Sequence, residues 1–248
     1  MKKLFVLGSV LSLLIITSCD KNECGCDTAP VNEKSYIQGF SELGEIQLSI
    51  GTGAKVDKAK NTITYGSENG LSIGVFIGDG GKGRGAITWD NSNADYYNKL
   101  VERIGDISYN KYPNSGITWA NADTLQVITI ICDKPMDDSH PAGCSLNDLF
   151  SIYFLDICAL VKNGYKPVTG SKYFSIVNEY YEYPYTLFGD RLSSVNLVEK
   201  PHIGIDIDLI LEAVPEHTDE YTFTVSVTNK QGKTIEKTTE PVRIKGAD

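Results

Sequence analysis

The chain has few positive charges for its length. Its 248 residues include 23 Lys and Arg against 32 Asp and Glu, which gives a formal net charge of −9 at pH 7. A nucleic-acid backbone is bound by clustered Lys and Arg that displace its counterions, and the sequence has no basic cluster of this kind. We therefore expect no nucleic-acid partner, and the same negative charge disfavours flat binding to an anionic lipid surface.

Long apolar segments are lacking after the N-terminal region. The apolar run at residues 4–16 follows Lys2 and Lys3 and is too short to span a bilayer, which needs about 20 apolar residues. A basic start followed by a short apolar run is typical of a secretory signal peptide. No later run approaches spanning length, so we expect no transmembrane helix.

The end of this signal, Ile-Thr-Ser-Cys at residues 16–19, resembles the bacterial lipobox. The resemblance implies cleavage after Ser18 and lipidation of the Cys19 thiol, whereas an ordinary secretory signal would leave Cys19 available for a disulfide. Each buried methylene contributes about 0.8 kcal/mol, and two acyl chains hold a protein stably at a membrane. We expect a membrane partner through lipid on Cys19. Removal of the signal takes away two positive charges, so the net charge becomes −11.

The chain divides into three parts by composition. Residues 1–18 are the predicted signal peptide, and residues 19–33 are polar without hydrophobic periodicity, as in a flexible tether. Residues 34–248 are long enough to bury a large core and are predicted to form one β-sandwich domain.

The number of cysteines left after lipidation of Cys19 is odd. Six cysteines are present, and lipidation of Cys19 would leave five, so at least one thiol stays unpaired within a monomer. Cys24 and Cys26 lie in the predicted tether. The cysteines of the folded region, among which a disulfide is expected with its pairing left open, are Cys132, Cys144 and Cys158.

Alternation of apolar and polar residues with a period of two dominates the domain and predicts strands. The pattern is clear at residues 46–50, 71–77, 203–211 and 221–227. Residues 125–132 form a β-branched apolar run, which predicts a strand buried on both faces. A turn at 229–232 and strands at 234–238 and 241–244 complete a meander typical of the end of a sandwich.

Helical patterns are scarce. Residues 94–104 place four apolar side chains on one stripe, which predicts an amphipathic helix, and residues 145–148 resemble a capping box that opens a second, short helix. The predicted fold is mainly β, an immunoglobulin-like β-sandwich with one or two short helices.

Two glycine motifs match the letters of functional motifs without their expected context. Residues 70–74 spell G-x-S-x-G, but Ser72 lies within an alternating strand instead of on a sharp turn before a helix. Residues 78–83 spell G-x-G-x-x-G, but the residues after them have a strand pattern and provide no helix N-terminus for a phosphate. We therefore expect no nucleotide partner.

An acidic loop follows the apolar run at 125–132. Asp133, Asp137, Asp138 and His140 lie close together in sequence, and calcium takes six to eight oxygen ligands. Their spacing matches no known calcium loop. We expect a solvated acidic loop and no cofactor. The alternative is a calcium ion bound by Asp133, Asp137 and Asp138.

Aromatic residues are concentrated near residue 180. Exposed rings with hydroxyl groups suit sugar faces and protein partners, whereas a loop folded over the sandwich would bury them. The residues predicted as a binding surface are Tyr180, Tyr181, Tyr183, Tyr185 and Phe188.

The signal with Cys19 and the stretches at 128–133, 140–143 and 146–150 resemble small Bacteroides-type (Bacteroidota) cell-envelope lipoproteins of unknown function. The resemblance implies attachment to the outer membrane, at either its periplasmic or its surface face, and implies no activity.

Three functions remain open from the sequence. The first is a non-enzymatic, lipid-anchored envelope protein that binds a glycan or an envelope protein. The second is an exported hydrolase that uses Ser72 or the Asp137, Asp138 and His140 loop. The third is a structural envelope lipoprotein.

Overall fold

The computed structural model describes residues 35–52, 54–65, 71–78, 86–88, 92–109, 118–177 and 186–248. All of them belong to one compact unit, Asn32–Asp248. The predicted signal peptide and tether lie outside the described residues, so their predictions stand as made.

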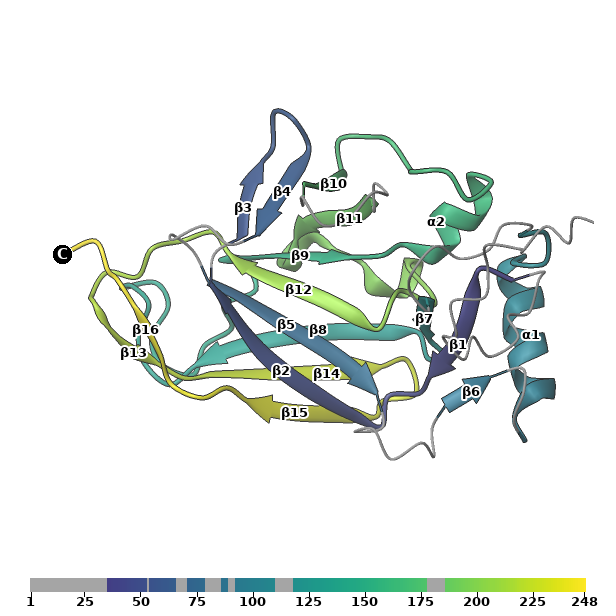
Figure 1. Cartoon of the computed structure of the whole chain (residues 1–248). Coiled ribbons are helices and arrows are strands. Elements are labelled where there is room, and N and C mark those ends of the chain that lie inside the picture. Colours follow the sequence, from purple (N-terminus) through teal and green to yellow (C-terminus); the bar gives the residue numbers. More distant parts are fainter. Residues whose placement is uncertain are drawn as a thin grey trace, which may run out of the picture. The chain divides into compact units, whose positions relative to one another are not determined.

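The largest element of this unit is an eight-stranded sheet (Figure 1). Its strands in spatial order are β2 (Glu45–Thr52), β5 (Leu71–Gly78), β12 (Asp206–Leu211), β9 (Phe150–Phe154), β11 (Thr186–Arg191), β10 (Tyr173–Val177), β4 (Thr62–Tyr65) and β3 (Ala54–Asp57). Neighbouring strands are antiparallel, except that β10 and β4 are parallel.

Within the described ranges, three smaller sheets accompany it. One contains β15 (Thr234–Thr238), β14 (Phe223–Asn229) and β8 (Leu125–Cys132), all antiparallel. A second contains β6 (Ala86–Thr88), β1 (Ile37–Ser41) and β7 (Thr118–Asn121), and a third pairs β13 (Asp219–Tyr221) with β16 (Val242–Ile244). The described helices are α1 (Ala94–Ile104), α2 (Ile157–Lys162) and the 3₁₀ turns η1 (Leu192–Ser194) and η2 (Leu197–Glu199).

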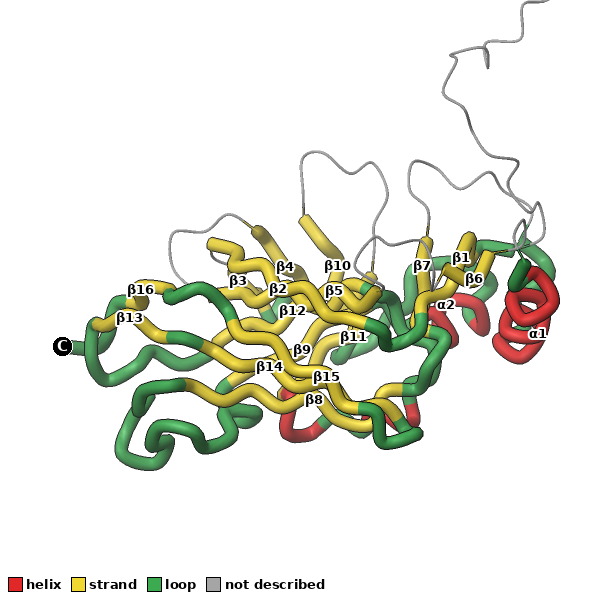
Figure 2. The backbone as a smooth tube through the Cα atoms, turned by 90° about the horizontal axis from the view of Figure 1, so that it is seen from below, coloured by secondary structure: helices red, strands yellow, loops and turns green. Residues whose placement is uncertain are grey.

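The main core lies between the eight-stranded sheet and the sheet of β8, β14 and β15. Because side chains alternate along a strand, every second residue of β5, β12 and β14 points into it, and all of these are buried. Phe150 of β9 meets Phe223 of β14 edge to face, with ring centroids 5.9 Å apart. Figure 2 shows how strongly strands predominate over helices. The predicted mainly β fold, with sandwich-like packing and two short helices, is confirmed.

Helix α1 covers a second core. It spans the predicted residues, and Tyr97, Leu100, Val101 and Ile104 are buried against β1, β6, β7 and α2. The Tyr97 hydroxyl donates a hydrogen bond of 2.6 Å to the carbonyl of Ile37. The helix ends at Gly105, whose φ of +80° suits glycine at a left-handed C-cap.

Two details of the sequence prediction were wrong. Strand β8 is buried on one face instead of both, and the side chain of Val127 is 41% exposed, because the three-stranded sheet is covered by the main core on a single side. Residues 147–149 form a turn and not a helix. The Asn147 amide bonds the backbone of β8 instead, and this competes with helix formation.

None of the helices in the described residues is long and apolar enough to cross a membrane.

Truncation of a side chain at the centre of the main core should destabilise the protein. Leu209 of β12 is fully buried, so Leu209→Ala should lower the free energy of unfolding by about 3 kcal/mol because it leaves a cavity. Ile50→Ala is the matched control, since the Ile50 side chain is 38% exposed, and it should cost less than about 1 kcal/mol. Urea unfolding followed by circular dichroism measures both, and equal losses would contradict the assigned core.

Candidate functional site

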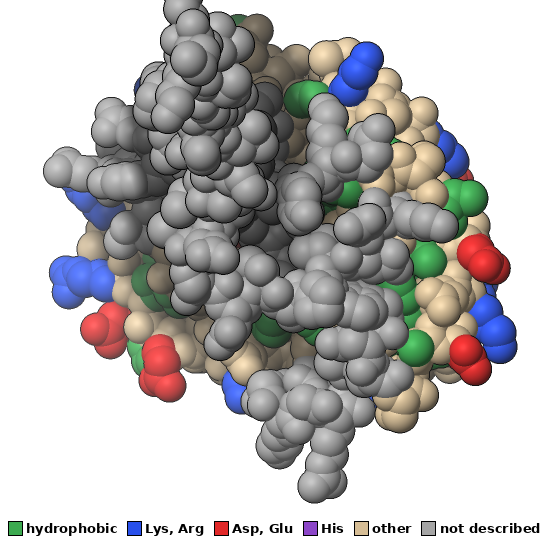
Figure 3. Space-filling view, turned by 45° about the vertical axis from the view of Figure 1, so that its right-hand side comes forward, with side chains coloured by type: hydrophobic (Ala, Val, Ile, Leu, Met, Phe, Trp, Pro, Cys, Tyr) green, Lys and Arg blue, Asp and Glu red, His purple; other side chains and the backbone are tan. Residues whose placement is uncertain are grey.

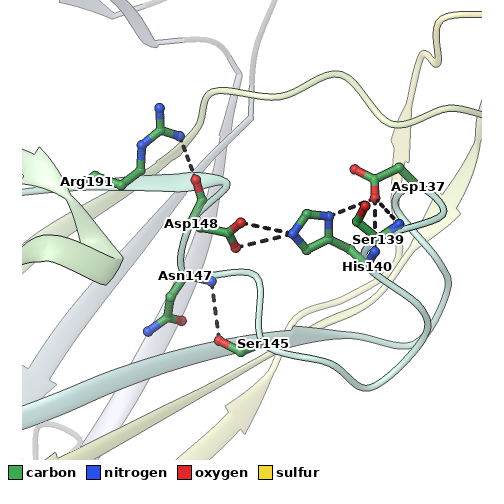
Figure 4. Close-up of polar contacts among 7 residues, drawn as sticks. All are labelled: Asp137, Ser139, His140, Ser145, Asn147, Asp148 and Arg191. Carbon is green, nitrogen blue, oxygen red and sulfur yellow. Dashed lines mark hydrogen bonds and ion pairs between the residues drawn. The ribbon is translucent and has the colours of Figure 1, made fainter.

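The loop between β8 and β9, residues 133–149, holds a histidine between two carboxylates (Figure 4). His140 Nδ1 lies 2.8 Å from Asp137 Oδ1, and His140 Nε2 lies 3.1 Å from Asp148 Oδ2. A protonated imidazole donates from both nitrogens, so this arrangement favours the charged ring. We call the three residues the His140 clasp.

The backbone of the loop positions the clasp. Asp137 Oδ1 also accepts hydrogen bonds from the backbone N–H groups of Ser139 and His140, at 2.8 and 2.9 Å. This turn is typical of Asp, whose short side chain can bond to its own chain two or three residues ahead. On the other side, the Asp148 carbonyl accepts a 2.7 Å bond from Arg191 of β11. The clasp therefore connects the tip of the loop to the point where β9 begins.

The charges of the clasp shift its titration. The pKa of His140 is raised above its ordinary value of 6.5. The hydrogen bond to Asp137 is the largest cause, and the hydrogen bond to Asp148 is the next. The bond to His140 is also the largest cause that lowers the pKa of Asp137. Both shifts favour the ion pair near neutral pH.

The clasp does not form a hydrolytic site with the predicted nucleophile. Ser72 is buried in β5 between Gly51 of β2 and Ile210 of β12, in a strand that continues to Gly78. Among the described residues no hydrogen bond joins Ser72 to a histidine. Both nitrogens of His140 face carboxylates, and a general base needs a free nitrogen within hydrogen-bond reach of its nucleophile.

The three predicted calcium ligands point to different partners. Asp133 Oδ1 accepts a 2.8 Å bond from the backbone N–H of Thr222, Asp137 bonds His140, and Asp138 is exposed. Within the part of the chain that the structure describes, no three His, Cys, Asp or Glu residues are arranged to hold a metal ion. The structure therefore does not assemble the calcium site considered from the sequence.

The cysteines of the folded region are free thiols. Cys132, Cys144 and Cys158 are all unpaired in the structure, so the disulfide expected among them is not formed there. Cys158 lies on α2 beside the second core, and its thiol donates to the carbonyl of Pro201 at 3.3 Å. Cys132 and Cys144 belong to the main core, which separates Cys158 from both.

The predicted aromatic surface is corrected at one position. Phe188 is buried in the main core, 5.1 Å from the ring of Phe154 between centroids, and the ammonium group of Lys200 lies 4.3 Å from the Phe188 ring centroid. Its ring is therefore not available to a ligand. The other predicted residues, Tyr180, Tyr181, Tyr183 and Tyr185, lie outside the described residues.

The structure shows an exposed aromatic residue that was not selected from the sequence. Phe76 of β5 is 39% exposed on the outer face of the eight-stranded sheet, the face away from the main core. It lies directly opposite Gln47 of β2 on one side and Asp206 of β12 on the other. Both neighbours are exposed polar residues.

Glycine allows the Phe76 ring to lie along its strand. A Cβ added at Gly78 would lie 2.8 Å from Phe76 Cε1, so the ring covers the space that a side chain at Gly78 would fill. In the next cross-strand row along this face, Gly74 of β5 lies between Ser49 of β2 and Asp208 of β12. Ser49 and Gly74 are both small. We call the six residues Gln47, Ser49, Gly74, Phe76, Asp206 and Asp208 the Phe76 shelf.

A sequence signal for this surface existed. Residues 71–77 alternate, with Leu71, Ile73, Val75 and Ile77 on the core face. Phe76 is a large aromatic residue on the opposite face, where polar residues are expected.

Comparisons with known proteins give little help with function. No protein-family model matches the chain, and no curated protein matches it. Among solved structures, the chain is similar to a DUF4466 family protein from Parabacteroides merdae, at 11% sequence identity and a TM-score of 0.30. The match covers 82% of this chain and 45% of that protein, so the chain spans less than half of its length. A similarity at this level supports no conclusion about fold or activity.

The clasp predicts a pH-dependent stability. The folded-state pKa of His140 is raised, so its contribution is complete below about pH 6.5 and is lost as pH rises through the raised value. The lowered pKa of Asp137 gives a contribution that is present above about pH 4 and is lost on acidification. Asp148→Asn should therefore lower the melting temperature more at about pH 5.5 than at about pH 8.5.

Asp138→Asn is the matched control for this measurement, because it removes one exposed carboxylate from the same loop outside the clasp. Differential scanning fluorimetry at the two pH values gives the comparison. A loss for Asp148→Asn that is the same at both values would show that the clasp does not depend on His140 protonation.

Proposed function

We propose that this protein is a lipid-anchored cell-envelope protein that binds a neutral glycan on the Phe76 shelf. The observation that supports the proposal is the exposed Phe76 ring, which lies over Gly78 with a carboxylate and an amide on its two sides.

The chemistry of the shelf matches the two kinds of surface on a sugar ring. The face of an aromatic ring is apolar and carries negative partial charge, so it attracts the weakly positive C–H groups on one face of a pyranose. Asp206 accepts hydrogen bonds from sugar hydroxyls, and Gln47 both donates and accepts. Beside the ring, the Ser49 hydroxyl lies over Gly74, where an added Cβ would be 2.5 Å from Ser49 Oγ. This hydroxyl offers a further donor and acceptor to a second sugar unit.

The charge of the shelf favours a neutral ligand over an anionic one. Asp206 and Asp208 both lie on it. The pKa of Asp206 is raised, mainly by partial desolvation and to a smaller extent by repulsion from Asp208. A uronic acid or sulfated sugar would meet like charge at this position, which costs binding energy. On the face drawn in Figure 3, acidic and basic side chains of the described residues are interspersed near the rim.

The lipid anchor supports the same function. Lipid on Cys19 followed by a polar tether at 19–33 would place the domain close to the outer membrane and leave it free to reorient. We propose attachment to the outer membrane on this basis.

Removal of the Phe76 ring tests the proposed site. Phe76→Ala should weaken binding of a neutral oligosaccharide by about tenfold or more, because the stacking area is lost. The ligand is first selected with the wild-type protein on an array of neutral and anionic glycans, and the affinity is then measured by isothermal titration calorimetry. Val127→Ala is the control, since Val127 has a similar exposure, 41%, on the outer face of the other sheet.

Equal affinities of wild type and Phe76→Ala would remove the site assignment. Selective retention of anionic glycans on the array would overturn the proposed class of ligand.

The anchor has its own test. Cys19→Ser should abolish incorporation of labelled palmitate and move the protein from the membrane fraction to the soluble fraction, because one thiol carries the lipid. Cys24→Ser, five residues further along the predicted tether, should change neither result. Label that persists in Cys19→Ser would contradict anchoring at that residue.

A further inference from the structure

The loop that contains the His140 clasp returns along the edge of β8. Ile131 and Ser145 form an isolated antiparallel bridge. Hydrogen bonds lie on both sides of it, from Leu146 N–H to the Ile130 carbonyl at 2.8 Å and from Gly143 N–H to the Cys132 carbonyl at 2.7 Å. Residues 143–146 therefore run antiparallel to β8 for a short distance.

The register shifts by one residue beyond this bridge. A regular ladder with Ile131 opposite Ser145 would bond the Cys144 N–H to the Cys132 carbonyl. The Gly143 N–H bonds that carbonyl instead, so Gly143 and Cys144 together lie opposite Cys132, as the two residues of a β-bulge oppose one residue of the partner strand. A disulfide forms between Cα atoms about 4.4 to 6.8 Å apart, and residues that face each other across antiparallel strands lie at about this spacing.

The two side chains also share a face. Cys132 is buried in the main core, and the half-buried Cys144 packs against the same core. Their neighbours Ile130 and Leu146, one on each strand, are buried there too. The side chain of Ser145, which lies between Cys144 and Leu146, is exposed. Both thiols therefore project toward the core side of the same short ladder.

We propose that Cys132 and Cys144 are a redox pair that forms a disulfide closing residues 133–143, the first part of loop 133–149. The oxidant is a disulfide of the envelope, either a small molecule or a thiol–disulfide oxidoreductase. The thiolate of Cys144, the more accessible of the two, attacks this disulfide and forms a mixed disulfide, which releases one reduced thiol. Cys132 then loses its proton to solvent and attacks the Cys144 sulfur, which releases the second reduced thiol.

The second step needs the Cys132 thiolate, which is scarce at neutral pH. Burial is the main cause that raises the pKa of the Cys132 thiol to about 11, and the thiolate is the attacking species. The fraction of thiolate therefore grows about tenfold for each pH unit below that value. Ring closure should follow this dependence.

The bond would close a loop that contains two of the three clasp residues. The 13 residues from Cys132 to Cys144 include Asp137 and His140. A disulfide of this loop length restricts the unfolded chain. It would also hold the base of the loop when His140 is neutral.

Peptide mapping of the full-length mature protein in detergent tests the pair. After incubation with oxidised glutathione and trapping of free thiols with iodoacetamide, tandem mass spectrometry of the unreduced digest should identify a link between Cys132 and Cys144. The link should persist in Cys158→Ser and disappear in Cys144→Ser, and its rate of formation should increase about tenfold between pH 7 and pH 8.

Stability gives an independent measurement. The oxidised protein should melt about 5 °C or more above the reduced protein, with a smaller change between about pH 5.5 and pH 8.5 than the reduced protein shows. Cys144→Ser should melt at one temperature regardless of the oxidant. Three results would overturn the proposal: both thiols alkylated after oxidation, Cys132 linked to Cys158, or Cys132 linked to Cys24 or Cys26.

Discussion

The burial of apolar side chains between the eight-stranded sheet and the sheet of β8, β14 and β15 is the constraint on which the other features depend. It fixes the register of every long strand, because a shift of one residue would turn the core face outward. Phe150 and Phe223 meet at its centre. Once this register is set, Phe76 must face outward on β5, and Cys132 must face inward on β8. The candidate binding surface and the candidate redox pair are both consequences of the same alternation.

Much of the fold follows from local sequence patterns. The helix at Ala94–Ile104 and the strand at Thr234–Thr238 have the predicted bounds, and the apolar face of 71–77 is buried as expected. These segments could be predicted because each has one covered face and therefore a regular period. The single covered face of β8 could not be predicted, because its β-branched residues are apolar on both sides, and the exposed side of a three-stranded sheet depends on partners that are distant in sequence.

The site residues were harder to predict for a related reason. The sequence showed that Asp137, Asp138 and His140 are close together, but it did not show that Asp148 completes the clasp from the far end of the loop. The many aromatic residues near residue 180 suggested a binding surface. One of them, Phe188, is buried in the core instead. Alternation along β5 places Phe76 on the outer face, but its neighbours across strands appear only when β2 and β12 are placed beside it.

The path of loop 133–149 also has a consequence for solubility. Strand β8 lies at the border of its three-stranded sheet, and an uncovered border strand offers its backbone to another molecule. Here the loop occupies those groups: the Asn147 side chain bonds Ile128 and Ile130, and the backbone of Gly143 and Leu146 bonds Cys132 and Ile130. Release of the loop would uncover a strand rich in isoleucine and valine, so the contacts that fasten it also protect the protein from aggregation with copies of itself.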